Sequence, residues 1–143
     1  MEQIKIYLSG GMGGLTFEEQ VGWRNKVINA ITYGDYELNV KPIFFNPPTY
    51  YCPALEPEYK TEKEVMEFDL NWLRKSDLVI VNFNVPQSIG TAMELILAKE
   101  HHIPVIGLNK DNLELHPWLI ECTTRMCSTM RELVDYVTSF YLK

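Results

Sequence analysis

Short apolar segments alternate along this chain with longer segments of helical periodicity, and this alternation limits the fold more than any other feature. The segments rich in β-forming residues are 4–8, 40–45, 78–83 and 103–108, with a fifth candidate at 119–123. The segments with the period of an amphipathic helix are 17–31, 62–75, 91–101 and 130–141. Strands separated by helices pair in parallel through right-handed crossovers. We therefore predict a doubly wound α/β domain, with a mostly parallel five-stranded sheet and helices on both faces.

The chain has the size and composition of a single globular domain. Its 143 residues suffice to bury an ordinary core, so we expect one domain over 1–143 with no linker. The net charge of −6 provides no basic surface for a nucleic-acid backbone. The three cysteines lack the spacing of a metal site, and no segment approaches transmembrane length. We expect a cytoplasmic protein without a metal, a cofactor, or a membrane or nucleic-acid partner.

The segment 69–94 carries the strongest indication of function. It has the pattern of a helix end, a buried strand, a loop containing Ser88 and Gly90, and the first turn of a further helix. That turn places Glu94 at the carboxyl end of a strand, where open α/β sheets bind their ligands. Asp69, in the helix that precedes this strand, is a candidate for the same ligand-binding site. A glycine in the loop lets another molecule approach the backbone closely, and a serine provides a hydroxyl.

Glu94 also has a purely structural explanation. A helix start of the form Thr-x-x-Glu is a capping box, in which the Thr side chain accepts from the third helical N–H and the Glu reaches back to the Thr N–H. This pattern occurs at 16–19, 61–64, 91–94 and 129–132. Its recurrence means that the pattern alone needs no catalytic explanation for Glu94. The composition of the preceding loop is what favours function.

Several short motifs fall where strands and helices end. The first strand ends in Ile6-Tyr7-Leu8-Ser9-Gly10-Gly11, and the central segment contains Asp69-Leu-Asn-Trp-Leu, Ser76-Asp77, Pro86-x-Ser88-x-Gly90 and Glu94-Leu95. Together these motifs resemble the nucleoside 2-deoxyribosyltransferase superfamily, and the central segment is most similar to its 2′-deoxynucleoside 5′-monophosphate N-hydrolases. There is also a similarity to the phosphoribohydrolases of the lysine-decarboxylase-like family, whose preceding Gly-Gly pair this chain lacks.

The resemblance implies a flavodoxin-like fold, a homodimer or higher homo-oligomer, and cleavage of the bond between a base and a deoxyribose. By motif position, Glu94 is the nucleophile, Tyr7 the hydroxyl that orients it, and Asp69 the carboxyl that contacts or protonates the departing base. The C1′ carbon becomes oxocarbenium-like as the base leaves, so an adjacent carboxylate can stabilise it or bond to it. Two carboxyls that differ in burial can hold the two protonation states that this reaction needs. The C-terminal segment 123–143, with Trp118 nearby in sequence, is the candidate contact surface between subunits.

The resemblance also suggests where the substrate binds. Ser88 has the position of a phosphate-binding Ser in the monophosphate hydrolases, where many deoxyribosyltransferases have an Asp for the sugar, and so favours a nucleotide. Those hydrolases also carry an Arg in the N-terminal loop, where this chain has Gly13, and Arg24 in the next helix is the alternative candidate. The loop 49–59 is long enough to be a lid or a wall rather than a plain connection. The expected substrate-binding residues are Ser9, Gly10, Gly11, Asn84, Ser88 and Gly90.

Simpler explanations stand beside these roles. A strand residue such as Tyr7 commonly serves packing, a mid-helix Asp69 commonly faces solvent, and the run 9–14 fits an ordinary strand exit. We expect an enzyme that passes the sugar of a 2′-deoxynucleoside, or of its 5′-monophosphate, to another base or to water. A strict nucleoside 5′-monophosphate N-glycosidase is one alternative, and a non-catalytic nucleotide-binding or signalling module is another.

Overall fold

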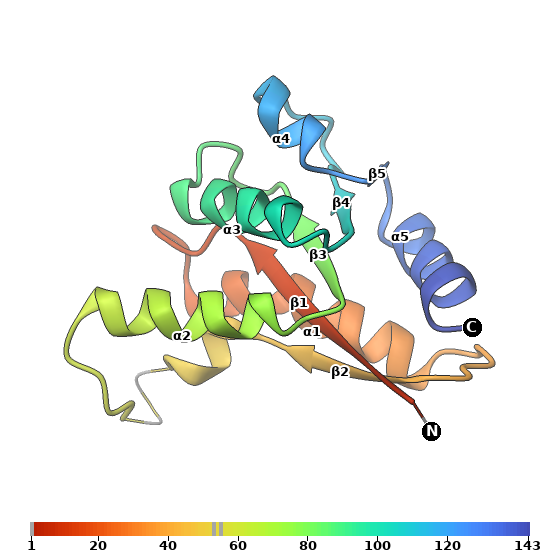
Figure 1. Ribbon diagram of the computed structural model, residues 1–143, viewed down its shortest axis with the longest axis horizontal. Coiled ribbons are helices and arrows are strands. Elements are labelled where there is room, and N and C mark those ends of the chain that lie inside the picture. Colours follow the sequence, from red (N-terminus) through yellow and green to blue (C-terminus); the bar gives the residue numbers. More distant parts are fainter. Residues whose placement is uncertain (1, 53, 55) are drawn as a thin grey trace.

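The computed structural model describes residues 2–52, 54 and 56–143, and it contains a five-stranded sheet whose strands are all parallel. The strands are β1 (Gln3–Gly10), β2 (Lys41–Phe45), β3 (Leu78–Asn82), β4 (Val105–Leu108) and β5 (Arg125–Cys127). Their order across the sheet is β2-β1-β3-β4-β5 (Figure 1). Each crossover contains a helix, so the predicted doubly wound α/β domain is confirmed, and its strand order is that of flavodoxin-like folds.

Helices cover both faces of the sheet (Figure 1). One face packs against α1 (Phe17–Tyr33) and α5 (Met130–Tyr136), which continues as the π-helical turn η3 (Val137–Tyr141). The other face packs against α2 (Glu62–Arg74), α3 (Ile89–Glu100) and the short α4 (Pro117–Glu121). Side chains alternate along a strand. In β1, Ile6 and Leu8 therefore enter the core beneath α1 and α5, while Tyr7 lies on the side of α2 and α3.

The fifth strand lies later in the chain than the sequence predicts. The segment predicted as a strand, 119–123, mostly belongs to α4, and β5 follows at the edge of the sheet. The helix begins there because Pro117 occupies its first turn, where a missing N–H costs nothing. His116 caps the turn, and its Nδ1 accepts from the Trp118 N–H at 3.1 Å. The prediction of a strand at 119–123 is therefore wrong: the cap and Pro117 begin a helix that takes up most of this apolar segment.

Two of the four predicted capping boxes are complete, at Thr16 and Thr61. The box at Thr129 is half formed, because the Glu132 carboxylate accepts from the neighbouring Ser128 N–H. The box predicted at 91–94 is wrong. Helix α3 starts earlier, with Ser88 as its cap, and the Ser88 hydroxyl accepts from the Thr91 N–H at 3.2 Å. Thr91 thus lies inside the helix, and the structural explanation for the glutamate one turn later no longer applies.

Candidate active site

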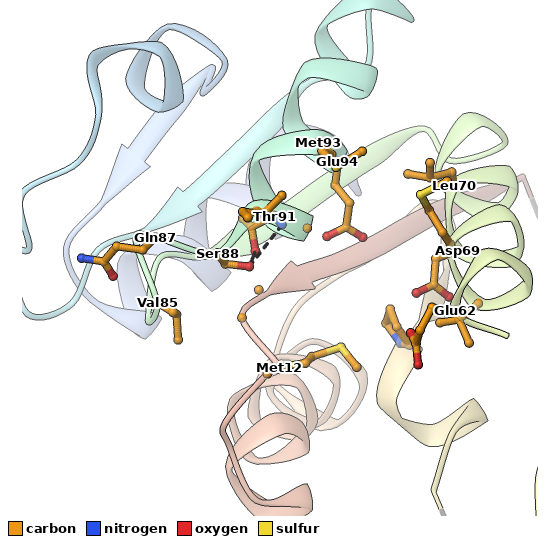
Figure 2. Close-up of a pocket in the computed structure, with 18 of the residues that line it drawn as sticks. Met12, Glu62, Asp69, Leu70, Val85, Gln87, Ser88, Thr91, Met93 and Glu94 are labelled. Carbon is orange, nitrogen blue, oxygen red and sulfur yellow. Dashed lines mark hydrogen bonds between the residues drawn. The ribbon is translucent and has the colours of Figure 1, made fainter.

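The candidate site lies where the strand order reverses. From β1 the chain crosses to β2 on one side, while β3 pairs with β1 on the other, so the C-terminal ends of β1 and β3 frame a crevice. A cavity of about 640 Å³ lies there, a volume typical of small-molecule sites. Its walls are the loop 10–13, the first turns of α3 and the side of α2 (Figure 2).

Glu94 lies on the α3 wall and is held by two hydroxyls from β1. The Tyr7 hydroxyl donates to Oε2, and Ser9 Oγ donates to Oε1 at 2.9 Å. Tyr7 and Ser9 are two residues apart in a strand, so their side chains share one face of the sheet. The Tyr7 ring also packs on Phe45, with the ring centroids 5.2 Å apart. Tyr7 therefore combines the packing role with the predicted contact to Glu94.

The surroundings of Glu94 favour its protonated form. Burial raises the pKa of its carboxyl from 4.5 to about 7, and the hydrogen bonds from Tyr7 and Ser9 only partly oppose this. Burial, followed by the charge of Glu94, raises the pKa of Tyr7 well above its usual value. Tyr7 thus stays protonated at neutral pH and remains a donor, while Glu94 exchanges its proton close to physiological pH.

Asp69 projects from α2 toward the same cavity, and Figure 2 shows its carboxylate and that of Glu94 on facing walls. The Tyr51 hydroxyl donates to Asp69 Oδ1 at 2.6 Å. Burial raises the pKa of Asp69 from 3.8 to about 6, against the effects of the Tyr51 hydrogen bond and of Arg24. Asp69 is half-buried and hydrogen-bonded, which does not fit the simpler explanation of a solvated helix face.

Tyr51 is a site residue that the sequence did not reveal. It lies in the loop 49–59, which was expected to be a lid or a wall, and which includes Pro53 and Leu55, outside the described residues. The described residues of this loop do not line the cavity, and the Tyr51 ring meets Tyr59 edge-on. A loop tyrosine has no periodic relation to a helical aspartate, so no pattern in the sequence could have paired them.

The glycine loop is packed directly against the loop that follows β3. The Gly11 N–H donates to Asn84 Oδ1 at 3.2 Å, and a Cβ placed on Gly11 would lie 2.5 Å from the Val85 Cβ. Only glycine allows this approach. Asn84 therefore fixes the loop, and Ser9 holds Glu94, whereas Gly10 and Gly11 line the cavity.

Ser88 and Gly90 line the opposite side of the cavity, at the start of α3. The Ser88 hydroxyl already caps the helix and also accepts from the Thr91 hydroxyl at 3.0 Å. A Cβ placed on Gly90 would meet no atom within 4 Å, so the space beside it is open. The first N–H groups of a helix have no carbonyl partner within it, and together they attract anions.

Arg24 lines the cavity at its base and is almost entirely buried. The side chain is 1% exposed, and its nitrogens donate to the carbonyls of Leu8, Gly10 and Gln20 at 3.2, 3.2 and 2.5 Å. These bonds commit the guanidinium to the backbone, which does not favour the expected replacement of a phosphate-binding Arg at Gly13.

The described residues show neither a metal cluster nor a membrane-spanning helix. Among the residues that the structure describes, no cluster of three or more His, Cys, Asp or Glu side chains could hold a metal ion. Within the same residues, none of the helices combines the length and the apolar character that crossing a bilayer requires.

Comparisons by sequence gave no relatives: no protein-family model matches the chain, and no curated protein does. Solved structures do match. A 2-deoxyribosyltransferase from Bacillus psychrosaccharolyticus is 17% identical, with 92% of this chain and 91% of that chain covered and a TM-score of 0.73. A 2-deoxyribosyltransferase from Leishmania mexicana is 14% identical, with 97% and 99% covered and a TM-score of 0.64.

A third match is the CMP N-glycosidase BcmB of Clostridium botulinum. It is 15% identical, with 96% of this chain and 99% of that chain covered and a TM-score of 0.58. These likenesses extend over nearly the whole chain and show a shared fold. The fold that the sequence motifs implied is therefore confirmed.

Proposed function

We propose that this protein is an enzyme of the nucleoside 2-deoxyribosyltransferase superfamily that cleaves the N-glycosidic bond of 2′-deoxynucleosides or of their 5′-monophosphates. The observation that supports this most is a pair of carboxyls, Glu94 and Asp69, facing one cavity at the switch point of the sheet. The shared fold with two 2-deoxyribosyltransferases and a CMP N-glycosidase supports the same reaction class.

In this proposal Glu94 attacks C1′ of the sugar. The bond from its carboxylate oxygen to C1′ forms as the bond from C1′ to the base nitrogen breaks, which gives a glycosyl-enzyme and, after the second displacement, retained configuration. The hydroxyls of Tyr7 and Ser9 each bind one carboxylate oxygen, so the group cannot rotate freely. Fixing the nucleophile in this way reduces the entropy lost on reaching the transition state.

Asp69 supplies the proton that the departing base needs. A carboxyl with a pKa of about 6 is partly protonated at neutral pH and can act as a general acid. The Tyr51 hydroxyl binds Oδ1, which leaves Oδ2 to carry the proton toward the base. Water or a second base then resolves the glycosyl-enzyme, so one site serves hydrolysis and transfer alike.

A strict 5′-monophosphate N-glycosidase is the second candidate. It is favoured by the start of α3, where the Ser88 hydroxyl and the first helical N–H groups line the cavity. Since Arg24 is committed to the backbone, phosphate binding would depend on these neutral donors and on Lys63, an exposed cation that also lines the cavity. We therefore expect the preference for a monophosphate to be modest.

We further propose that the enzyme is a homo-oligomer. Three apolar side chains of α3 form one stripe at helical spacing and remain exposed, namely Ile89 (76%), Met93 (46%) and Ile96 (45%). Met93 also lines the cavity, so a second copy seated on this stripe would lie at the mouth of the site. This contact differs from the expected C-terminal segment, although Phe140 there is also exposed. A strict monomer in light scattering at micromolar concentration would contradict this proposal.

The reaction is tested by incubating the protein with 2′-deoxynucleosides and their 5′-monophosphates, with and without a second free base, and by measuring released base by chromatography. Stimulation by a free base would identify a transferase, and release without one a hydrolase. A 2-fluoro-2-deoxy sugar substrate should add the mass of its sugar to the peptide that contains Glu94. If the wild type cleaves no substrate and forms no adduct, a non-catalytic nucleotide-binding module becomes the better explanation.

A further inference from the structure

Strand β1 extends beyond its neighbour on one side. Strand β2 ends at Phe45, opposite Tyr7, whereas β1 continues to its last residue, Gly10. Residues two apart in a parallel strand direct their carbonyls to the same neighbour. The carbonyl of Glu2 accepts from the Lys41 N–H of β2, so the carbonyls of Leu8 and Gly10 face the same side. Because β2 has already ended there, it cannot supply N–H partners for these two carbonyls.

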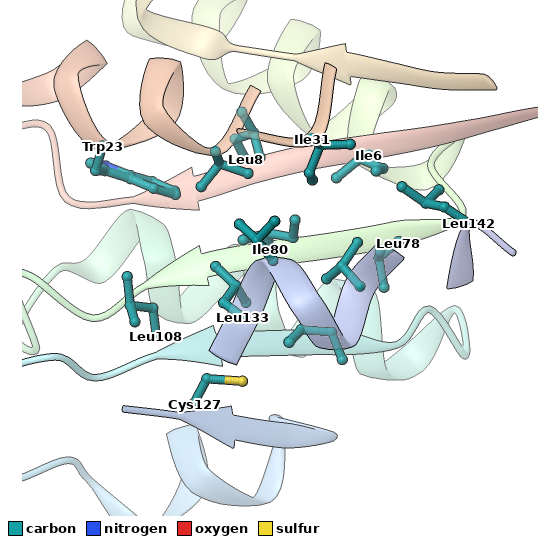
Figure 3. Packing of buried hydrophobic residues seen from close by; sticks show 14 residues of the cluster. Ile6, Leu8, Trp23, Ile31, Leu78, Ile80, Leu108, Cys127, Leu133 and Leu142 are labelled. Atoms are coloured by element: carbon teal, nitrogen blue, oxygen red, sulfur yellow. The ribbon is translucent and has the colours of Figure 1, made fainter. Parts of the chain in front are cut away.

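Arg24 occupies this uncovered edge. Its Nε donates to the Leu8 carbonyl and one terminal nitrogen to the Gly10 carbonyl, so a single planar guanidinium pairs with both acceptors. It lies 4.7 Å from the centre of the Trp23 ring, which Figure 3 shows beside Leu8 at the end of β1. A Cβ on Gly10 would lie 2.9 Å from that ring, so the arginine, the indole and the strand end are tightly packed.

We infer that Arg24 is a positioning residue, whose guanidinium takes the place of a neighbouring strand and so fixes the segment that carries Tyr7 and Ser9. Ser9 lies between the two carbonyls that Arg24 binds, and its hydroxyl holds Glu94. An end of β1 without Arg24 would leave two buried carbonyls unsatisfied and would fray. This inference rests on the proposed function only in that Glu94 is taken as the reacting group.

Arg24 also supplies a positive charge to a site of buried carboxyls. The groups that act on Glu94 are Tyr7 and Ser9 from β1, Asp69 from α2 and Arg24 from α1. Arg24 is the cation among them, and it lowers the pKa of both carboxyls. Burial lowers the pKa of Arg24 itself to about 10, so it remains charged at neutral pH. The charge therefore keeps Glu94 ionised at a lower pH than burial alone would allow.

The test follows the carboxyl carbon of Glu94 by NMR across pH in three variants. Arg24→Met removes the charge and the hydrogen bonds while keeping a side chain of similar length. Arg24→Lys keeps the charge but loses the planar guanidinium that binds both carbonyls. Arg74→Met, at an exposed position in α2, is the control with the same change in charge. We expect Arg24→Met to raise the pKa of Glu94, by less than one unit because Arg24 is the weakest of the influences on this carboxyl. Arg24→Lys and Arg74→Met should leave it near the wild-type value.

Arg24→Lys provides a second measurement, which tests the inference even if Arg24→Met does not fold. In this variant we expect the amide of Ser9, which faces β3, and that of Gly11, which donates to Asn84, to exchange hydrogen at least about tenfold faster than in the wild type. The kcat of the variant should fall with KM little changed. An unchanged pKa of Glu94 in folded Arg24→Met, or wild-type amide protection in Arg24→Lys, would overturn the inference. Neither readout needs turnover, so both still decide the role of Arg24 if no substrate is cleaved.

Discussion

The substitution Glu94→Gln separates a catalytic carboxylate from a structural one, because the two roles predict opposite changes in stability. Burial raises the pKa of Glu94 from 4.5 to about 7. A carboxyl with a higher pKa in the folded state stabilises the fold only when protonated, so this stability is present below the unfolded pKa and is lost as pH rises through the folded pKa. Since one pKa unit corresponds to about 1.4 kcal/mol, the difference between the folded and unfolded pKa of Glu94 lowers the stability of the fold by about 3 kcal/mol at pH 8 and by about 1 kcal/mol at pH 5.

Gln cannot ionise, and its amide oxygen can still accept from one of the two hydroxyls that hold Glu94. Loss of the second hydrogen bond costs about 1 kcal/mol. We therefore expect Glu94→Gln to be more stable than the wild type by roughly 2 kcal/mol at pH 8 and about equally stable at pH 5. In the same protein, base release should fall by several powers of ten, because a neutral amide cannot attack C1′.

The assay is urea unfolding at both pH values, together with base release by the same preparations. Glu19→Gln is the matched control, because Glu19 closes a complete capping box and hydrogen bonds from Thr16 lower its pKa. That variant should gain no stability at pH 8. A Glu94→Gln protein that is less stable than the wild type at pH 8, or that turns over at the wild-type rate, would refute the reasoning.

Three further predictions concern the walls of the cavity. We expect the wild-type pH profile of kcat/KM to be bell-shaped, with limbs near pH 6 and pH 7, the pKa values of the two carboxyls. Asp69→Asn should remove one of these limbs. A variant profile that keeps both limbs would assign that titration to another group. A methyl group at Gly90 meets no protein atom, so Gly90→Ala should keep the stability of the fold, but KM should rise about tenfold because the methyl occupies space that the ligand would fill. Gly22→Ala, which is also in open space, is the control. If the two variants have equal kinetics, Gly90 does not contact the ligand. Ser88→Gly deletes the hydroxyl but changes the stability of the helix cap by only a few tenths of a kcal/mol. The ratio of kcat/KM for a monophosphate to that for its nucleoside, expected to be about ten- to hundredfold in the wild type, should fall. An unchanged ratio would contradict a contact between Ser88 and the phosphate.

The sheet was predictable wherever the local pattern and the tertiary environment agree. The residues of β3 are apolar almost throughout and are buried on both faces, as a central parallel strand requires. Strand β5 has three residues at the edge of the sheet, too few to show a period. Its place depends on α4 ending at Glu121 and on pairing with β4, and neither is visible in a short window of sequence.

The motifs predicted the two proposed reacting groups and the Tyr7 hydroxyl that holds Glu94, but not the other residues that hold them. The motifs indicated Glu94 and Asp69, but Ser88 and Thr91 are equally acceptable helix caps, so the start of α3 could not be decided locally. Glu94 lies in the helix that Ser88 caps, and it is held by the hydroxyls of Tyr7 and Ser9, which precede it by more than 80 residues in the chain. Contacts of this range leave no trace in spacing.

The order of the two pKa values implies that the substrate completes the site. Before a substrate binds, a single shared proton lies preferentially on Glu94, with a pKa of about 7, rather than on Asp69, with a pKa of about 6. The proposed reaction needs the reverse arrangement, with Asp69 protonated and Glu94 ionised, so the arrangement ready for attack is the minor one before a substrate binds. A base lying on Asp69 would exclude water and raise the pKa of Asp69, while the developing positive charge at C1′ would lower that of Glu94. In the proposed reaction, both effects move the proton to Asp69 only when a base and its sugar occupy the cavity together, so Glu94 becomes a nucleophile only in their presence.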